Sequence, residues 1–292
     1  MTPAALAALA AAAFAGGAVN AVAGGGTLIA FPAALAVGLS PLTANATNAV
    51  AMAPAALASA WAYRREVREE VGLVRVLALP ALLGGAAGSV LLLSTPPGLF
   101  ARIVPGFVLA ATMLLLVQNL RTPPRAEDAP PASPRARMIV SALTFLVSVY
   151  GGYFGAGMGL LMLATFGLLG PGDTHRRNGL RSVLGALVNG VAAVFFVASG
   201  SVDAPAALVM AVSASLGGWG GAWVLRRVPA RAVRWIIVAL GAVLTVVLAT
   251  RLFAVREGGA EQRFAEPLVA LGVEMDAVLP REIGTQSIGV AA

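Results

Sequence analysis

Two short polar clusters interrupt an otherwise apolar chain, and their side chains are of the types that bind an oxyanion. The first cluster holds Asn45, Thr47 and Asn48, and the second holds Asn178 and Arg181. Amides and hydroxyls donate hydrogen bonds singly, whereas the planar guanidinium of an arginine can donate two in parallel. The same amides could instead cap or bridge helices, and Arg181 could be only a cytoplasmic anchor. The sequence leaves both explanations open.

A glycine-rich segment lies ahead of each polar cluster and interrupts an apolar stretch. These segments are residues 24–26 and residues 155–159. Each glycine inside a helix costs about 1 kcal/mol relative to alanine, so we expect the helix to break at both segments. Within a membrane, such a break is tolerated only where protein or a water-filled cavity satisfies the backbone.

The breaks could themselves form an anion site. A half-helix that begins at Gly26 or Gly157 would direct free N–H groups and the positive end of its dipole into the membrane. Two such ends that face each other would form one central site. The alternative is that the glycines only allow helices to cross closely. We prefer that alternative for residues 84–85 and 217–218, which lie in unbroken spans, and for Gly88, where we expect alanine to be tolerated.

We therefore predict a substrate-binding site at the two breaks and at the helix starts that follow them. The candidates are Asn20, Gly25, Gly26, Thr27, Asn45, Thr47, Asn48, Tyr153, Gly157, Met158, Asn178 and Arg181.

Catalytic, metal-binding and cofactor-binding residues are not expected. The chain has no cysteine and a single histidine, His175, which we place in a solvated loop beside arginines. Aspartate and glutamate are absent from the middle of every expected span, so the sequence indicates neither a proton relay nor an enzyme.

The two breaks belong to a longer repetition with a constant offset of 133 residues. One offset across separate regions is poorly explained by chance in a glycine-rich chain, so we interpret the chain as two homologous halves. The pairs at this offset include Gly24 and Gly157, Gly26 and Gly159, Asn45 and Asn178, Asn48 and Arg181, Gly84 and Gly217, Gly88 and Gly221, and Pro96 and Pro229.

The composition indicates a membrane protein. The 292 residues are 59% hydrophobic and 11% charged, and the mean hydropathy is +0.86. A soluble domain carries about 25% charged residues. The net charge of +7 comes from arginines that cluster between apolar runs, which favours a bilayer over nucleic acid as the partner.

The apolar runs predict an all-α polytopic membrane protein in which each half is a broken, re-entrant helical hairpin followed by three transmembrane helices. We expect a first transmembrane repeat at 1–120, a Pro/Arg-rich cytoplasmic linker at 121–137, a second repeat at 138–253 and a polar tail at 254–292. Runs at 28–38, 138–150 and 160–169 are too short to cross, whereas those at 42–62, 71–93, 99–120, 182–199, 204–225 and 232–253 are long enough.

The arginine clusters predict the topology. Short cytoplasmic loops are enriched in positive charge. If residues 138–169 crossed the membrane once, the clusters at 176–181 and 226–234 would lie outside. If these residues enter and return to the same side, both clusters lie inside with those at 64–75 and 121–137. The first hairpin then opens to the outside, and the two halves are inverted repeats.

The glycine-rich break, the short apolar run and the polar helix start, each present twice, resemble the TauE/SafE family of sulfite and organosulfonate exporters. The resemblance covers about residues 5–253. It rests on residues 24–28, Pro32, 38–41 and 45–48, and on residues 155–159, Gly170 and Asn178. It implies secondary transport of a small sulfur oxyanion across the bacterial inner membrane by alternating access.

The sequence leaves other classes of membrane protein open. A cation or metal carrier is the main rival, because broken helices also present carbonyl groups to cations. A carrier of another small solute and a non-transporting scaffold are further alternatives. The expected partners are a small anionic substrate and the lipid bilayer, with a homodimer possible and no nucleic acid.

Overall fold

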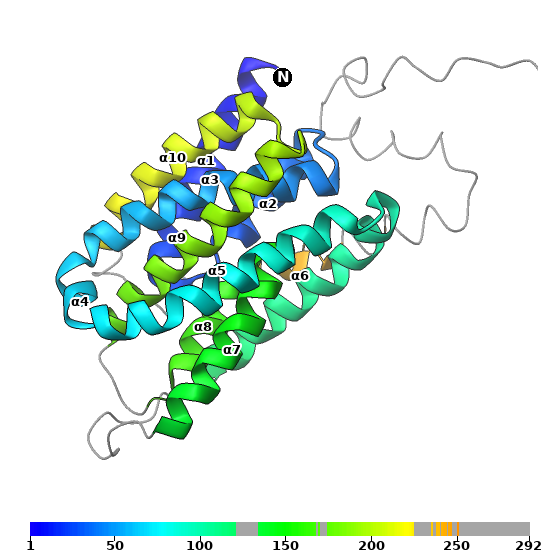
Figure 1. Cartoon of the computed structure of the whole chain (residues 1–292). Coiled ribbons are helices and arrows are strands. Elements are labelled where there is room, and N and C mark those ends of the chain that lie inside the picture. Colours follow the sequence, from blue (N-terminus) through cyan, green and yellow to red (C-terminus); the bar gives the residue numbers. More distant parts are fainter. Residues whose placement is uncertain are drawn as a thin grey trace, which may run out of the picture. The chain divides into compact units, whose positions relative to one another are not determined.

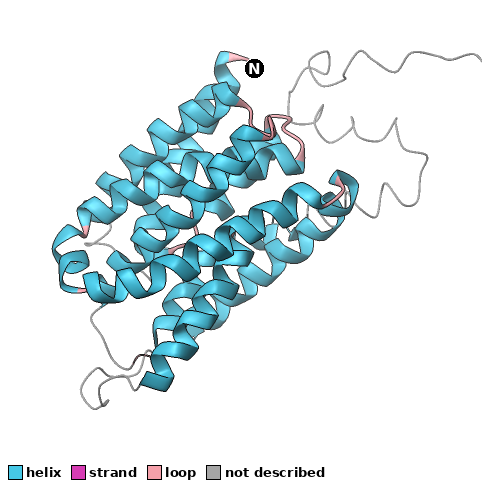
Figure 2. Ribbon diagram, in the orientation of Figure 1, coloured by secondary structure: helices cyan, strands magenta, loops and turns pink. Residues whose placement is uncertain are grey.

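The computed structural model describes residues 1–120, 134–167, 169 and 174–224, and single helical positions between residues 235 and 250. Within these ranges every regular element is a helix, and the connections are short (Figures 1 and 2). The helices are α1 (Pro3–Ala23), α2 (Thr27–Ala36), α3 (Pro41–Ala62), α4 (Arg64–Glu69), α5 (Val71–Ser94), α6 (Pro97–Leu120), α7 (Pro134–Tyr153), α8 (Met158–Gly167), α9 (Thr174–Ala198) and α10 (Ala204–Val224).

Five of these helices are long and apolar enough to cross a membrane: α1, α5, α6, α7 and α9. The expectation that the run at 138–150 is too short is wrong, because α7 begins earlier, at Pro134, and has 20 residues. The chain is therefore an all-α, multi-pass membrane protein, as its composition predicts. The tail at 254–292 and most of the span expected at 232–253 lie outside the described residues. The same holds for the linker as far as residue 133, whereas its last four residues belong to α7.

The helices break at both glycine segments, as predicted. α1 ends ahead of Gly24, whose φ of +77° is a left-handed conformation that favours glycine. The backbone between α7 and α8 has the same conformation twice, with φ of +80° at Gly155 and +77° at Gly157. Both breaks are thus local backbone features that other residues would strain.

α9 begins earlier than its hydropathy indicates. The expected start was residue 182, but the helix begins at Thr174, so Arg181 lies two turns inside it. In its first turn the guanidinium of Arg176 lies 2.7 Å from the carboxylate of Glu69 at the end of α4. His175 is therefore an exposed residue of this helix and not of a loop. A polar first turn outside the bilayer leaves no signal in a hydropathy profile.

The second break turns the chain back towards the end from which α7 starts. α5 and α9 start at the same end, because Arg176 pairs with Glu69, and midway along them Gly85 lies against Val188. α7 runs parallel to α5, since Gly84 meets Phe145 and Gly88 meets Val149. α8 ends a few residues before α9 begins, so α7 and α8 form a hairpin, the path predicted for this segment (Figure 1).

The first break also makes a hairpin, open to the opposite end. The carbonyl of Ala21, near the end of α1, accepts a hydrogen bond from the hydroxyl of Tyr63, just after α3, at 3.4 Å. α1 therefore ends on the side where α3 ends. α2 leads into the start of α3 and so returns to the other side. The inverted-repeat relation of the two halves stays a prediction.

Glycines set the distance between the long helices, as expected for the pairs at 84–85 and 217–218. A Cβ at Gly84 or Gly217 would overlap the carbonyl oxygen of Phe145 on α7 or of Phe14 on α1. The expectation that alanine is tolerated at Gly88 is wrong. A Cβ there would overlap the carbonyl oxygen of Val149, so α5 or α7 would have to move.

Candidate functional site

The tips of the two hairpins touch in the middle of the protein. A Cβ placed on Gly24, at the end of α1, would lie 3.0 Å from the carbonyl carbon of Gly159 in the first turn of α8. A Cβ on Gly159 would lie 2.9 Å from the Cα of Gly24. Only residues without a side chain allow this approach, so the glycines bring the starts of α2 and α8 to one place.

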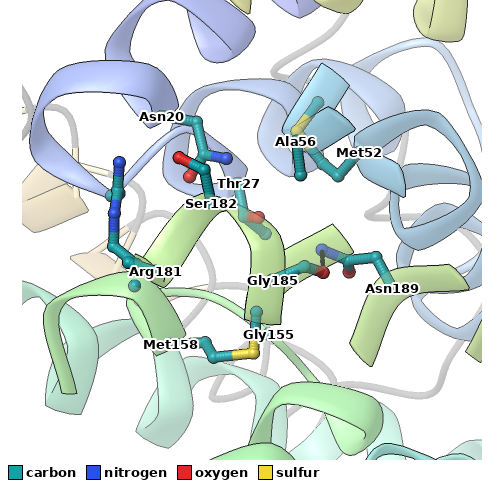
Figure 3. A pocket seen from close by; sticks show the side chains of 12 residues that line it. Asn20, Thr27, Met52, Ala56, Gly155, Met158, Arg181, Ser182, Gly185 and Asn189 are labelled. Atoms are coloured by element: carbon teal, nitrogen blue, oxygen red, sulfur yellow. Dashed lines mark hydrogen bonds between the residues drawn. The ribbon is translucent and has the colours of Figure 1, made fainter. Parts of the chain in front are cut away.

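A small cavity lies beside this contact, with walls from both hairpins, α3 and α9 (Figure 3). The space open to water-sized molecules is about 20 Å³, enough for about one water molecule. Its lining residues are Asn20, Gly24, Thr27, Met52, Ala56, Gly155, Met158, Gly159, Arg181, Ser182, Gly185 and Asn189. Asn20, Thr27, Met158 and Arg181 are sequence-predicted site residues.

Arg181 is the charged residue of this cavity and is only 3% exposed. Its Nη2 donates a hydrogen bond to the carbonyl oxygen of Ala21 at 2.9 Å. Its Nη1 lies at the hairpin tips, 2.9 Å from the position of a Cβ on Gly159. Nε has no hydrogen-bond partner, and no carboxylate pairs with Arg181, among the described residues. The arginine is thus a buried cation with donor capacity to spare.

The start of α2 forms another wall. Gly26 precedes the helix, and no side chain caps the N-terminus. Thr27 is buried and accepts a hydrogen bond from Nδ2 of Asn48 on α3 at 3.3 Å. The N–H groups of Leu28 and Ile29 donate to the carbonyls of Gly25 and Gly26, so this helix start contributes the positive end of its dipole and not a row of free donors. This wall therefore offers partial positive charge beside the full charge of Arg181.

Other predicted residues lie around the cavity and do not line it. Asn45 donates to the carbonyl of Tyr153 at 3.0 Å, and the hydroxyl of Tyr153 contacts Thr95. Thr47 accepts a hydrogen bond at 3.0 Å from the N–H of Asp203, the residue directly before α10. The remaining predicted positions that do not line the cavity are Gly25, Gly26, Asn48, Gly157 and Asn178, all buried.

Gly24, Gly155 and Gly159 line the cavity, although the sequence analysis places them in the glycine breaks and not among the candidates. Sequence reasoning also did not select the lining residues Met52, Ala56, Ser182, Gly185 and Asn189. The offset of 133 residues could have found four of them, because it pairs Met52 with Gly185 and Ala56 with Asn189. Both pairs line the same cavity, where α3 meets α9.

Aromatic rings hold the second hairpin in position. Phe154, directly after α7, stacks on Phe107 at 5.3 Å and meets Phe31 of α2 edge-on at 5.4 Å. The hydroxyl of Tyr150 donates to the carbonyl of Ala156 within the break. The rings thus cover the break, and the hydroxyl of Tyr150 satisfies one of its carbonyl groups. In the described part of the chain, no group of three His, Asp or Glu residues could hold a metal ion.

Comparisons with known proteins agree with this architecture. Over 157 residues the chain is 30% identical to a "probable membrane transporter protein" of Haemophilus influenzae, covering 52% of this chain and 58% of that protein. Over 170 residues it is 35% identical to a "probable membrane transporter protein ORF9" of a Sinorhizobium species, covering 54% and 61%. The alignments span less than two thirds of each relative, and no solved structure matches the chain.

The sequence profile described as "Sulfite exporter TauE/SafE" matches residues 9–248, which include both hairpins and every residue of the cavity. A match of this extent covers most of the chain, and the chain belongs to the TauE/SafE family of membrane proteins.

Proposed function

We propose that the protein is a secondary transporter that carries a small sulfur oxyanion, sulfite or an organosulfonate, across the bacterial inner membrane. Family membership supports the class of substrate, and the names of the two relatives support membrane transport. The anion binds in the cavity between the hairpin tips, at the start of α2 and beside Arg181.

The observation that carries this proposal is the unpaired buried guanidinium of Arg181. A buried charge without a counter-ion is costly, and such a residue within a membrane span is a functional-site candidate by default. A bound anion would supply the missing counter-charge and accept from Nε, which lacks a partner among the described residues. The same fixed positive charge disfavours a cation as the cargo of this cavity.

The size of the cavity supports alternating access. The structure has room there for about one water molecule, whereas sulfite has four heavy atoms. Binding therefore requires the hairpin tips to separate, and the contact between Gly24 and Gly159 is the place where they part. Closing around the anion would exclude water and strengthen its attraction to Arg181.

The proposal is tested by transport in proteoliposomes that contain the purified full chain. Labelled sulfite, an alkanesulfonate, sulfate and a divalent metal are offered separately, with protein-free vesicles as the background. Uptake or efflux of sulfite or the sulfonate that Arg181→Gln reduces at least tenfold is the expected result. Transport of the metal alone, or anion transport that is unchanged in Arg181→Gln, would overturn the proposal.

A further inference from the structure

The two halves carry different charges at one pair of equivalent positions. The offset of 133 residues pairs Arg181 of α9 with Asn48 of α3, and each is 3% exposed. In the second half, Arg181 donates to the carbonyl of Ala21 in the last turn of α1. The carbonyl groups at a helix C-terminus lack intrahelical donors and carry the negative end of the dipole. A fixed cation therefore complements the end of this half-helix.

The end of α7 is complemented differently. The residue at the offset position of Ala21 is Phe154, which directly follows α7. The donor that the structure places at this end is the neutral amide of Asn45, which donates to the carbonyl of Tyr153 at 3.0 Å. Asn48, at the position of the arginine, donates instead to Thr27 at 3.3 Å. The first half thus has the amide of Asn48 where the second half has the guanidinium of Arg181, whereas Asn45 is matched by another amide, Asn178.

These amides have acceptor atoms without partners. Oδ1 of Asn45 and Oδ1 of Asn48 accept no hydrogen bond from any described residue, although the side chains are only 2% and 3% exposed. The amide of Asn45 cannot be reversed, because the carbonyl of Tyr153 only accepts and must face Nδ2. The two residues are three apart on α3 and share a face of the helix. Buried carbonyl-type oxygens that lack donors are ligands for hard cations.

We propose that Asn45, at the C-terminal end of α7, and Asn48, three residues further along α3 and in contact with the start of α2, bind a monovalent metal cation, Na⁺, in place of the guanidinium that the second half carries. The two Oδ1 atoms supply ligands, and the negative end of the α7 dipole adds attraction. Neutral oxygen ligands without a carboxylate suit a monovalent ion, because a divalent ion loses far more hydration free energy on burial. Na⁺, the smaller of the two abundant monovalent cations, suits a closely packed site.

The cation would lie next to the proposed anion site. Asn48 contacts Thr27, and Thr27 lines the cavity of Arg181. A bound Na⁺ and a bound anion in neighbouring sites attract each other, so each ion would raise the affinity of the protein for the other. This coupling rests on the proposed anion transport, whereas the cation site itself does not.

The site is tested by thermal unfolding of the purified full chain in detergent, without sulfite. The midpoint is compared in NaCl, KCl and choline chloride at equal ionic strength. A ligand that binds only the folded state raises the midpoint in a saturable manner. We expect this rise with NaCl and not with choline chloride. Asn45→Ala and Asn48→Ala should lose it, whereas Ser215→Ala should keep it, because the hydroxyl of Ser215 donates to the carbonyl of Ala211 within α10.

Two further variants of Asn48 keep the test decisive if the alanine variants do not fold. Asn48→Asp keeps a contact with Thr27, whose hydroxyl can donate, and adds a negative ligand, so half-maximal stabilisation should need about tenfold less NaCl. Asn48→Arg supplies the charge itself and should unfold at a midpoint independent of NaCl. The proposal is overturned if the parent protein responds equally to NaCl and choline chloride, or if the response to NaCl persists in Asn48→Arg. If the parent protein does not transport sulfite but NaCl still raises its unfolding midpoint, the proposed function is wrong and the cation site stands.

Discussion

Nη2 of Arg181 lies 2.9 Å from the carbonyl oxygen of Ala21, so a residue of the second half closes the end of the first half-helix of the chain. The hydroxyl of Tyr63 reaches the same carbonyl at 3.4 Å. One oxygen thus joins α1, α9 and the end of α3 at the wall of the cavity.

The first prediction concerns the replacement of the Arg181 guanidinium by a lysine ammonium group. If the guanidinium binds the anion while still bonded to Ala21, Arg181→Lys should weaken substrate binding, because a point charge replaces a planar group with several donors. A charge-assisted hydrogen bond contributes about 1.5–3 kcal/mol, so we expect KM for sulfite to rise roughly 10- to 100-fold. The measurement is concentration-dependent transport in proteoliposomes.

The matched control is Arg135→Lys, an exposed arginine at the start of α7. It should transport like the parent, because lysine satisfies the positive-inside rule equally well. An unchanged KM in Arg181→Lys would make Arg181 a topological anchor only.

The second prediction concerns the contact between the hairpin tips. Gly159→Ala would place a methyl group 2.9 Å from both the Cα of Gly24 and Nη1 of Arg181, so the tips and the guanidinium must shift. We expect transport to fall at least tenfold while the protein still inserts and is purified in normal amounts. Gly167→Ala, on the same helix, meets nothing within 4 Å and should transport normally. Equal activity of both variants would show that the close approach is dispensable.

The third prediction concerns helix crossing at Gly88. Gly88→Ala should lower the midpoint of thermal unfolding in detergent, because the methyl group overlaps the backbone of α7 and overpacking costs about 1–3 kcal/mol. Gly190→Ala, in α9, meets nothing within 4 Å and should leave the midpoint unchanged or raise it slightly. The prediction fails if both variants unfold at the same temperature as the parent.

The fourth prediction concerns the side of the membrane on which each end of α9 lies. The chain has no cysteine, so Ser201→Cys and His175→Cys each introduce a single thiol. Ser201 lies between α9 and α10, and the exposed His175 lies at the opposite end of α9. A membrane-impermeant thiol reagent should label Ser201→Cys in intact cells, and His175→Cys only after permeabilisation. The reverse pattern would contradict the orientation expected from the arginines.

Properties that depend on residues close together in the chain could be predicted from the sequence. The membrane class follows from hydropathy, and the broken helices follow from the glycines at 24–26 and 155–159, because these preferences act within a few residues. The path of the second hairpin followed from arginine counts, since charge near the bilayer orients each segment. The start of α9 at Thr174 could not be read in this way, because its first two turns are polar and leave no hydropathy signal.

Only the tertiary structure decided which predicted site residues meet. Asn45 and Thr47 are two apart on α3, yet one contacts Tyr153 and the other Asp203, because a helix directs such residues to different faces. The neighbour that each face meets depends on how the helices cross. These crossings join residues that are more than 100 positions apart in the chain. For the same reason Arg181 became the buried cation of a cavity, a position that neither its side-chain type nor its place in the repeat could determine.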